Sequence, residues 1–401
     1  MVARLTRALG SRHLAVAEDA VQDALITALQ QWPFQGVPDQ PAAWLYLVAR
    51  NRALDRLRHA KMALDKEPAI AHAGPAFQRP EIEALLRDEF RPMHDDPRGL
   101  LFLTCHPAIA ADARVAMALK LVGGFSVGEI ARAFLTQDST IAQRLVRAKR
   151  TLREQGIDFG MPALADLGPR LDSVLDSLYL MFNEGYAATA GDALIRDDVA
   201  GEAIRLTSLV TAHPATDSPR AWALLSLMLL HAARFPARID SSGTVFLLRD
   251  QNRANWDRDA IAAGLHALDR ASTGDRLSRF HIEAGIAACH AVAPSWDDTD
   301  WRQIVGLYDE LLALTASPVV AMNRAIALSR VEGPVSGLAA LASMAGRDAL
   351  DRYPLLPAVQ AELWRESGDL TQAVACYRAA LTLARSGPEQ RWLNSRLAHL
   401  V

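Results

Sequence analysis

Residues 126–154 read SVGEIARAFLTQDSTIAQRLVRAKRTLRE and predict two helices joined by a short turn. Ser126 and Glu129 have the spacing of a capping box, so the first helix begins there. Its apolar side comprises Ile130, Ala131 and Phe134. Polar residues at 136–138 form the turn, after which Asp138 or Ser139 can cap the second helix.

The second helix combines one apolar stripe with one basic face. Apolar residues recur at i, i+4, i+7 and i+11, namely Ile141, Leu145, Ala148 and Leu152. The opposite side carries Thr140, Gln143, Arg144, Arg147 and Arg150. Residues 139–153 contain five Arg or Lys and no Asp or Glu. Because Arg reaches guanine edges and phosphates and Gln pairs with adenine, the pattern favours a DNA-contacting helix-turn-helix over an ordinary solvated face.

Composition indicates a multidomain protein of the reducing cytoplasm. With 401 residues and half of them hydrophobic, we expect two or three domains with their own cores. The net charge of −3 hides an asymmetry, since residues 1–160 hold 21 Lys and Arg against 18 Asp and Glu, and residues 161–401 hold 22 against 28. Three scattered cysteines, Cys105, Cys289 and Cys376, indicate no disulfides.

No segment predicts export or membrane insertion. The first residues, MVARLTRALG, have no apolar stretch long enough for a signal peptide. The longest apolar run, residues 221–233, is too short to span a bilayer and predicts a buried core helix. We therefore expect a cytoplasmic protein without membrane contact.

Two helices are predicted in the first 60 residues. The first runs over residues 19–32, with a core stripe of Val21, Leu25, Ala28, Leu29 and Trp32. Its other side carries Asp19, Gln22, Asp23, Ile26 and Gln30. This side is either plain solvent surface or a docking surface for a basic partner helix, and the segment alone favours solvent surface. Residues 33–39 predict a loop because they contain two prolines and a glycine.

The second of these helices, over residues 41–58, is strongly basic. Its cations and the following lysine are Arg50, Arg52, Arg56, Arg58 and Lys61, against a single Asp55. Trp44 and Tyr46 lie beside them, and aromatic rings next to cations suit the gripping of unstacked single-stranded bases. A tryptophan at such a position is also commonly a core residue, so this signal is weak by itself.

Residues 62–97 predict a proline-rich linker with a short helix at 81–90, and residues 98–125 predict two helices ended by Gly123 and Gly124.

In the C-terminal part, Gly333 and Gly368 each close a helix that begins soon after a proline. The residues around Tyr377 have the small and aromatic pattern of a tetratricopeptide (TPR) repeat: Ala361, Trp364, Ala373 and Ala380. A generic helical bundle is the alternative. Residues 241–248 alone have strand character.

Signatures of catalysis are missing from the sequence. It contains no phosphate-binding glycine loop, no paired catalytic carboxylates and no metal-ligand spacing, and His94, Cys105 and His106 lack a metal-binding context. We therefore expect no enzyme, no cofactor and no metal. Residues 183–186 with Gln251, Arg253 and Trp256 could line a small-molecule pocket, but hydrogen-bonded structural residues are the favoured interpretation.

The order of these motifs resembles a known family. DAVQDAL, a Pro/Gly loop, AWLYLVARNRALDRLR, a linker and EIARAFLTQDSTIAQRLVRAKRTLRE are similar to the extracytoplasmic-function (ECF) group of bacterial sigma-70 factors, which contain sigma regions 2 and 4. The resemblance covers roughly residues 1–160, and the remainder looks like the subgroup with a long helical, TPR-like extension. It implies an all-α fold with region 2 at 1–61, the linker at 62–97, region 4 at 98–160, a helical extension at 161–300 and TPR-like repeats at 301–401.

The resemblance also implies partners and site residues. The partners would be promoter DNA and core RNA polymerase, through its beta-prime clamp helices and beta flap, with a protein or self-contact through the TPR-like part. Clamp-helix binding would fall to Asp19, Gln22 and Asp23. The minus-ten element would be captured by the loop 33–39 and held by Trp44, Arg50, Asn51, Arg52, Arg56 and Arg58. The minus-thirty-five element would be read by Thr140, Gln143, Arg144, Arg147, Lys149 and Arg150.

Two further expectations concern activity. Such factors usually carry about one more helix before the position of Met1, so we expect a shortened first helix to weaken region 2. The extension is implied to tune the factor in place of a separate anti-sigma protein, in either direction. The alternative function is a TPR-type interaction scaffold with a degenerate sigma-like front part.

Overall fold

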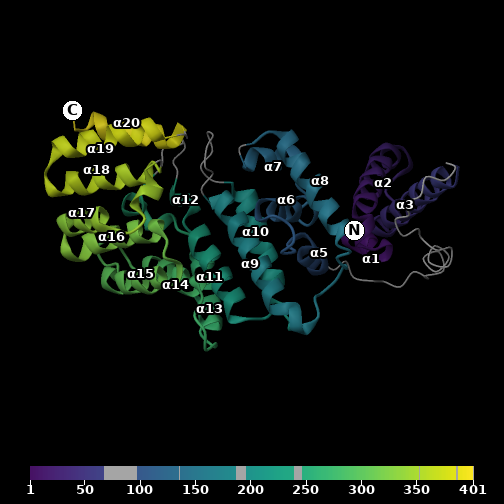
Figure 1. Cartoon of the computed structure of the whole chain (residues 1–401), viewed down its shortest axis with the longest axis horizontal. Coiled ribbons are helices and arrows are strands. Elements are labelled where there is room, and N and C mark those ends of the chain that lie inside the picture. The colour runs from purple at the N-terminus through teal and green to yellow at the C-terminus, as the bar shows by residue number, and fades with distance from the viewer. Residues whose placement is uncertain are drawn as a thin grey trace. The chain divides into compact units, whose positions relative to one another are not determined.

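The computed structural model describes residues 1–66, 97–134, 136–186, 196–238, 246–351, 353–384 and 387–400, and every regular element in these ranges is helical (Figure 1). The predicted all-α class is therefore confirmed. The chain divides into two compact units, one of Met1–Arg132 and Thr136–Ser177 and one of Ala133–Leu135 and Leu178–Val401. The helix predicted at residues 81–90 lies outside the described residues.

The first unit begins with a three-helix core. Its elements are α1 (Val2–Leu9), the 3-10 turn η1 (Ser11–His13), α2 (Leu14–Gln35) and α3 (Pro41–Lys66). The core residues are Leu5 and Leu9 of α1, Ala17, Ala20, Val21 and Ala24 of α2, and Ala49, Ala53 and Leu54 of α3. Alanines face each other across α2 and α3, which lets the two backbones approach closely. The short α1 covers one side of this core.

The core stripe predicted for residues 19–32, which lie in α2, is partly wrong. Val21 and Ala28 are buried, but Leu25 is 46% and Leu29 is 77% exposed. The alanine face of α2 packs against α3 and turns the leucines toward solvent, because alanine permits the closer helix contact. The helix also continues to Gln35 with Pro33 inside its last turn, so only residues 36–40 connect it to α3.

The rest of the first unit holds α5 (Pro97–Thr104), α6 (Ala111–Leu121), α7 (Val127–Ala133), α8 (Asp138–Glu154) and the first part of α9 (Leu164–Tyr186). The capping box is confirmed: the Ser126 amide donates to the Glu129 carboxylate at 2.7 Å, and the Glu129 amide donates to the Ser126 hydroxyl at 3.1 Å. The predicted cap of α8 is wrong, because Gln137 occupies that position without a side-chain bond. The predicted buried stripe of α8 is confirmed at Ile141, Leu145, Ala148 and Leu152.

The second unit is built from consecutive helices. They are the end of α9, α10 (Asp197–Thr211), α11 (Pro219–Ala232), α12 (Phe235–Arg238), α13 (Arg258–Ala271), α14 (Arg279–Val292), α15 (Trp301–Thr315), α16 (Pro318–Glu332), α17 (Pro334–Ser343), α18 (Leu355–Ser367), α19 (Leu370–Leu383) and α20 (Gly387–Ala398). Short 3-10 turns lie at η2 (Leu248–Asp250), η3 (Arg253–Asn255) and η4 (Arg347–Leu350). The apolar run of α11 is buried, as predicted.

From α15 onward each helix packs on the next, as Figure 1 shows. Gly333 and Gly368 end α16 and α18 with φ of 93° and 92°, a region open to glycine, so both predicted helix ends are confirmed. Tyr377 is fully buried between Ala361 and Ala373 of its own hairpin. The predicted strand is wrong where the chain is described, since residues 246–247 lead into the 3-10 turn η2. No described helix is both long and apolar enough to cross a membrane.

Candidate nucleic-acid interface

The outer face of α8 is cationic and partly committed to neighbouring carboxylates. Gln143, Arg147 and Arg150 are exposed, whereas Thr140 and Arg144 are half-buried. The Arg144 Nε lies 3.1 Å from a carboxylate oxygen of Asp112, and Arg150 lies 3.7 Å from Glu154 one turn later. Exposed pairs of this kind contribute at most about 1 kcal/mol, so they compete weakly with a phosphate.

Lys149 has a different environment from the other cations of α8. Its ammonium group binds the Glu18 carboxylate of α2, and Lys120 lies 3.8 Å from the same carboxylate. Glu18 is 7% exposed, so two lysines of the α6–α8 region neutralise a buried carboxylate of the first three-helix core. No local pattern predicts the pairing of Lys149 with Glu18, because 131 residues separate the two partners.

The predicted cations of α3 lie along its solvent side. Asn51, Arg52, Arg56 and Arg58 are exposed, and Arg50 is half-buried. The Arg58 guanidinium lies 3.3 Å from the carboxylate of Asp55, the only acid in residues 41–58.

Two aromatic residues of α3 are partly covered. The rings of Trp44 and Trp32 are 5.5 Å apart and tilted, and Trp44 is half-buried. The guanidinium of Arg4 lies 3.9 Å from the ring centroid of Tyr46. Trp44 therefore combines a packing contact with a solvent-facing part, while one face of Tyr46 is already covered by a cation.

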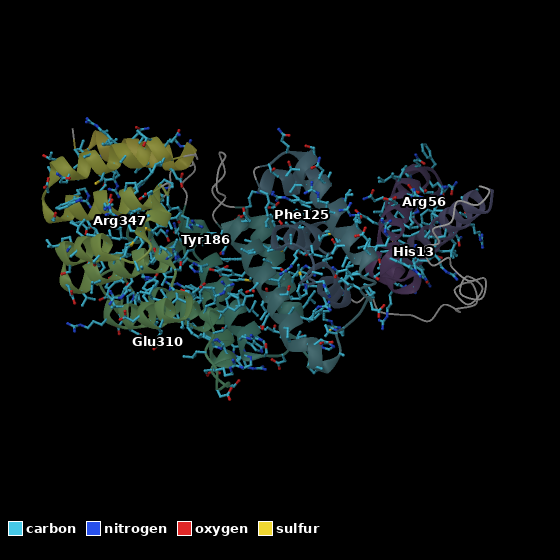
Figure 2. All side chains as sticks on the ribbon, viewed as in Figure 1. His13, Arg56, Phe125, Tyr186, Glu310 and Arg347 are labelled. Atoms are coloured by element: carbon cyan, nitrogen blue, oxygen red, sulfur yellow. The ribbon has the colours of Figure 1, made fainter. Side chains whose placement is uncertain are left out.

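The acidic edge of α2 faces α3. Arg56, labelled in Figure 2, donates to Asp19 at 2.9 Å and to Asp23 at 2.7 Å, so the structure joins a predicted DNA-binding residue to two predicted polymerase-binding residues. All three side chains remain at least one-third exposed. Gln22 is also exposed on α2.

The apolar part of this face was predicted from the sequence only at Ile26. Leu25, Ile26, Leu29 and, at 89%, Phe34 are exposed on α2, and the connection to α3 adds Val37 at 63%. Exposed apolar groups gathered on one domain are typical of a surface that a partner covers. The signal for it was the run of small residues at 17, 20, 24 and 28, which is spaced for close helix packing on the other side.

Nothing in this unit resembles a catalytic or metal centre among the residues described. Cys105 is buried, and burial raises the pKa of its thiol to about 11 despite hydrogen bonds with Ser177 and Thr104. Burial, aided by Arg170 and Arg114, lowers the pKa of His106 to about 4. No group of three His, Cys, Asp or Glu within the described ranges is placed to hold a metal ion.

Two family models match the chain. Residues 1–62 match Sigma-70 region 2, and residues 170–272 match a family of unknown function, DUF6596. An uncharacterized protein of Rhizobium meliloti (strain 1021) is 38% identical over 393 residues, covering 97% of this chain and 91% of that protein. The ECF RNA polymerase sigma factor SigL of Mycobacterium tuberculosis is 31% identical over 174 residues, covering 39% of this chain and 93% of that factor. No solved structure matches the chain.

These findings define a helical transcription initiation factor. The chain belongs to the ECF group of sigma-70 factors and carries a C-terminal extension that includes the DUF6596 segment. As a sigma factor it binds core RNA polymerase and promoter DNA, and it catalyses no reaction of its own.

Proposed function

We propose that three surfaces divide the work of promoter recognition. The acidic and apolar face of α2, including Asp19, Gln22 and Asp23, docks on the beta-prime clamp helices. The exposed cations of α3, together with Trp44, hold the melted minus-ten element. The outer face of α8 reads the minus-thirty-five element.

The observation that carries this proposal is the orientation of α2. Its alanines face the core, and Leu25, Ile26 and Leu29 face solvent beside two carboxylates. Burying apolar surface stabilises a protein by about 25 cal/mol per Å². The exposed leucines of α2 contribute none of this free energy unless a partner covers them. A basic partner helix with an apolar stripe matches both kinds of group on this face.

Replacing Leu29 with Asp tests the docking surface. Because Leu29 is 77% exposed, we expect L29D to leave the unfolding free energy within about 0.5 kcal/mol of wild type. Promoter-dependent run-off transcription with purified core polymerase should fall at least tenfold, about 1.4 kcal/mol of lost docking energy. The control is Leu277→Asp, another exposed leucine at 66%. Equal transcription by L29D and L277D would contradict the proposal.

Arg147→Ala tests the reading of DNA by α8. Arg147 is exposed and, among the described residues, pairs with no carboxylate, in contrast to Arg144. A base contact would make the variant lose about 1–3 kcal/mol of discrimination at one minus-thirty-five position. A phosphate contact would weaken all sequences alike and reduce the salt slope by about 0.9. Holoenzyme binding to a set of single-base promoter variants at several salt concentrations separates the two. Unchanged binding in both respects would remove Arg147 from the interface.

We also propose that the extension regulates the factor, through a protein or self-contact on its TPR-like stack. In support, the Rhizobium meliloti relative aligns across 97% of this chain, so the extension accompanies the sigma part there as well. Changes confined to the helices after residue 300 should alter transcript yield without altering promoter choice. Transcription that is indifferent to such changes would argue against regulation.

A further inference from the structure

We infer that the extension binds a small molecule carrying an oxyanion, a carboxylate or a phosphate, at a cluster of arginines in the second unit. The cluster comprises Arg234, Arg238 and Arg253 with the aromatic rings of Tyr186 and Trp256. Tyr186 ends α9, Arg234 lies in the turn between α11 and α12, and Arg238 ends α12. Arg253 begins η3, and Trp256 follows it. Tyr186 is labelled in Figure 2.

The three guanidinium groups surround two aromatic rings. The Arg238 guanidinium lies 3.9 Å from the centroid of Tyr186 and also donates to the Tyr186 carbonyl. Trp256 lies between two cations, with Arg253 at 4.6 Å and Arg234 at 5.9 Å from its ring. Arg238 is 9% and Trp256 is 3% exposed, so one charge and one ring of the cluster are removed from water, while Tyr186, Arg234 and Arg253 are half-buried.

No carboxylate balances this charge among the described residues. No ion pair joins any of the three arginines to a described carboxylate, and Asp298 acts on Arg253 only from beyond pairing distance. Glu184, two residues from Tyr186, has its pKa raised by burial, without a contribution from an arginine. A buried cation without a partner is costly, and an incoming anion removes that cost.

Unpaired hydrogen-bonding atoms point to the same ligand. Trp256 Nε1, His231 Nδ1 and His290 Nδ1 are buried and have no hydrogen-bond partner among the described residues. The His231 ring lies 4.9 Å from Tyr186. Burial, together with Arg234 and Arg253, lowers the pKa of His290 to about 3, so its imidazole is neutral near pH 7. An indole N–H and a neutral imidazole N–H both donate to an oxyanion.

Arg234 is the residue most available to the ligand. Arg253 is occupied by the carbonyls of His290 and Ala293, the latter at 2.7 Å, and Arg238 is occupied in part by Tyr186. Among the described residues, the Arg234 side chain forms a single hydrogen bond, a long one of 3.4 Å from Nε to the Gln251 amide oxygen. Arg234 is half-buried and reaches solvent. Its two terminal nitrogens can form a bidentate contact with a carboxylate or phosphate.

Calorimetric titration of the full chain tests the site with four probes: acetate, benzoate, inorganic phosphate and phenyl phosphate, in chloride buffer of matched ionic strength. We expect saturable one-to-one binding of at least one probe, tighter for the phenyl compound of each pair because of the two rings. The carboxylate and phosphate arms identify the anion. Arg234→Met should weaken binding about tenfold or more, and Arg276→Met, at an exposed arginine, should not.

Thermal unfolding gives a second, independent sign. In chloride alone, Arg234→Met should unfold at the same temperature as wild type or higher, because it removes the repulsion that Arg234 exerts on Arg238 and Arg253. With the binding probe present, wild type should gain stability and Arg234→Met should not. The inference is overturned by the absence of saturable binding for all four probes, by equal binding in Arg234→Met, or by a lower unfolding temperature of that variant in chloride. None of these outcomes bears on promoter recognition.

Discussion

Replacing Gly185 with Ala is expected to destabilise the second unit by about 3 kcal/mol, which is the upper end of the usual cost of overpacking a core. An added Cβ at Gly185 would lie 2.5 Å from the amide nitrogen and 2.9 Å from the Cα of Ala200. These atoms belong to the backbone of α10 and cannot rotate away, so α9 and α10 would have to separate. The Arg196 amide, which donates to the Gly185 carbonyl at 2.7 Å, would lose its geometry as well.

The measurement is the unfolding midpoint of the full chain, where about 3 kcal/mol corresponds to a fall of roughly 6–12 °C for a unit of this size. Gly201→Ala is the matched control, because Gly201 follows Ala200 in α10 but is exposed, and nothing lies within 4 Å of an added Cβ. That variant should gain about 1 kcal/mol from helix propensity. Similar midpoints for the two variants would show that α10 does not approach α9 at Gly185.

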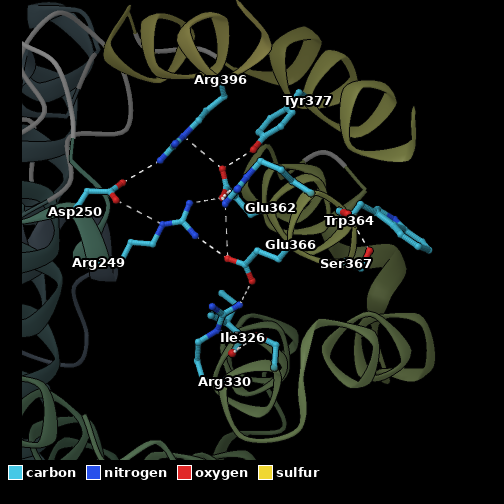
Figure 3. A network of polar contacts seen from close by, with 12 residues as sticks. Arg249, Asp250, Ile326, Arg330, Glu362, Trp364, Glu366, Ser367, Tyr377 and Arg396 are labelled. Atoms are coloured by element: carbon cyan, nitrogen blue, oxygen red, sulfur yellow. Dashed lines mark hydrogen bonds and ion pairs between the residues drawn. The ribbon is translucent and has the colours of Figure 1, made fainter. Parts of the chain in front are cut away.

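The second large effect is expected at Glu362, the centre of the ionic network in Figure 3. Its carboxylate accepts from Arg249 and from the Tyr377 hydroxyl, lies 2.9 Å from Arg365 and 3.5 Å from Arg396. Glu366, one turn later, binds Arg249 at 2.7 Å and also Arg330. The side chain of Glu362 is 12% exposed. The network therefore fastens the turn η2 to the helices α16, α18 and α20.

Glu362→Gln should cost about 3–5 kcal/mol, the usual penalty for leaving buried charges without their partner. Denaturant unfolding of the full chain measures it, with Glu332→Gln, at an exposed carboxylate outside the network, expected to change stability by less than about 0.5 kcal/mol. The same protein serves in run-off transcription, where a changed yield at an unchanged promoter sequence would support regulation by the extension. A loss of stability no larger than that of E332Q would show that the network contributes little.

The pH dependence of this effect has a definite sign. Burial alone would raise the pKa of Glu362, but the Tyr377 hydroxyl, Arg249 and Arg365 outweigh it and lower the pKa below its ordinary value of 4.5. A carboxyl with a lowered pKa in the folded state contributes stability that is present above 4.5 and is lost as the pH falls through the folded value. Wild type should therefore lose more stability than E362Q below about pH 4.5. A constant difference between the two would contradict this.

Local features of the chain were predictable because they depend on neighbouring residues. The capping box at Ser126 and Glu129 and the buried stripe of α8 follow from backbone geometry and the 3.6-residue period, and both are present. The order of the motifs was enough to recognise the sigma family. The orientation of α2 was harder to predict, because its alanines and leucines are both apolar. The helical period alone does not tell which of them face α3.

Tertiary packing settles the remaining questions. It turns Leu25 and Leu29 outward, since only the alanine face of α2 fits the small residues of α3. It also brings together charges that are far apart in the chain, such as Glu18 with Lys149 and Arg249 with Glu362. The helical period of a sequence is a property of each segment and can be read locally. Which charged side chains meet depends on how distant segments pack, and no pattern within either segment encodes it.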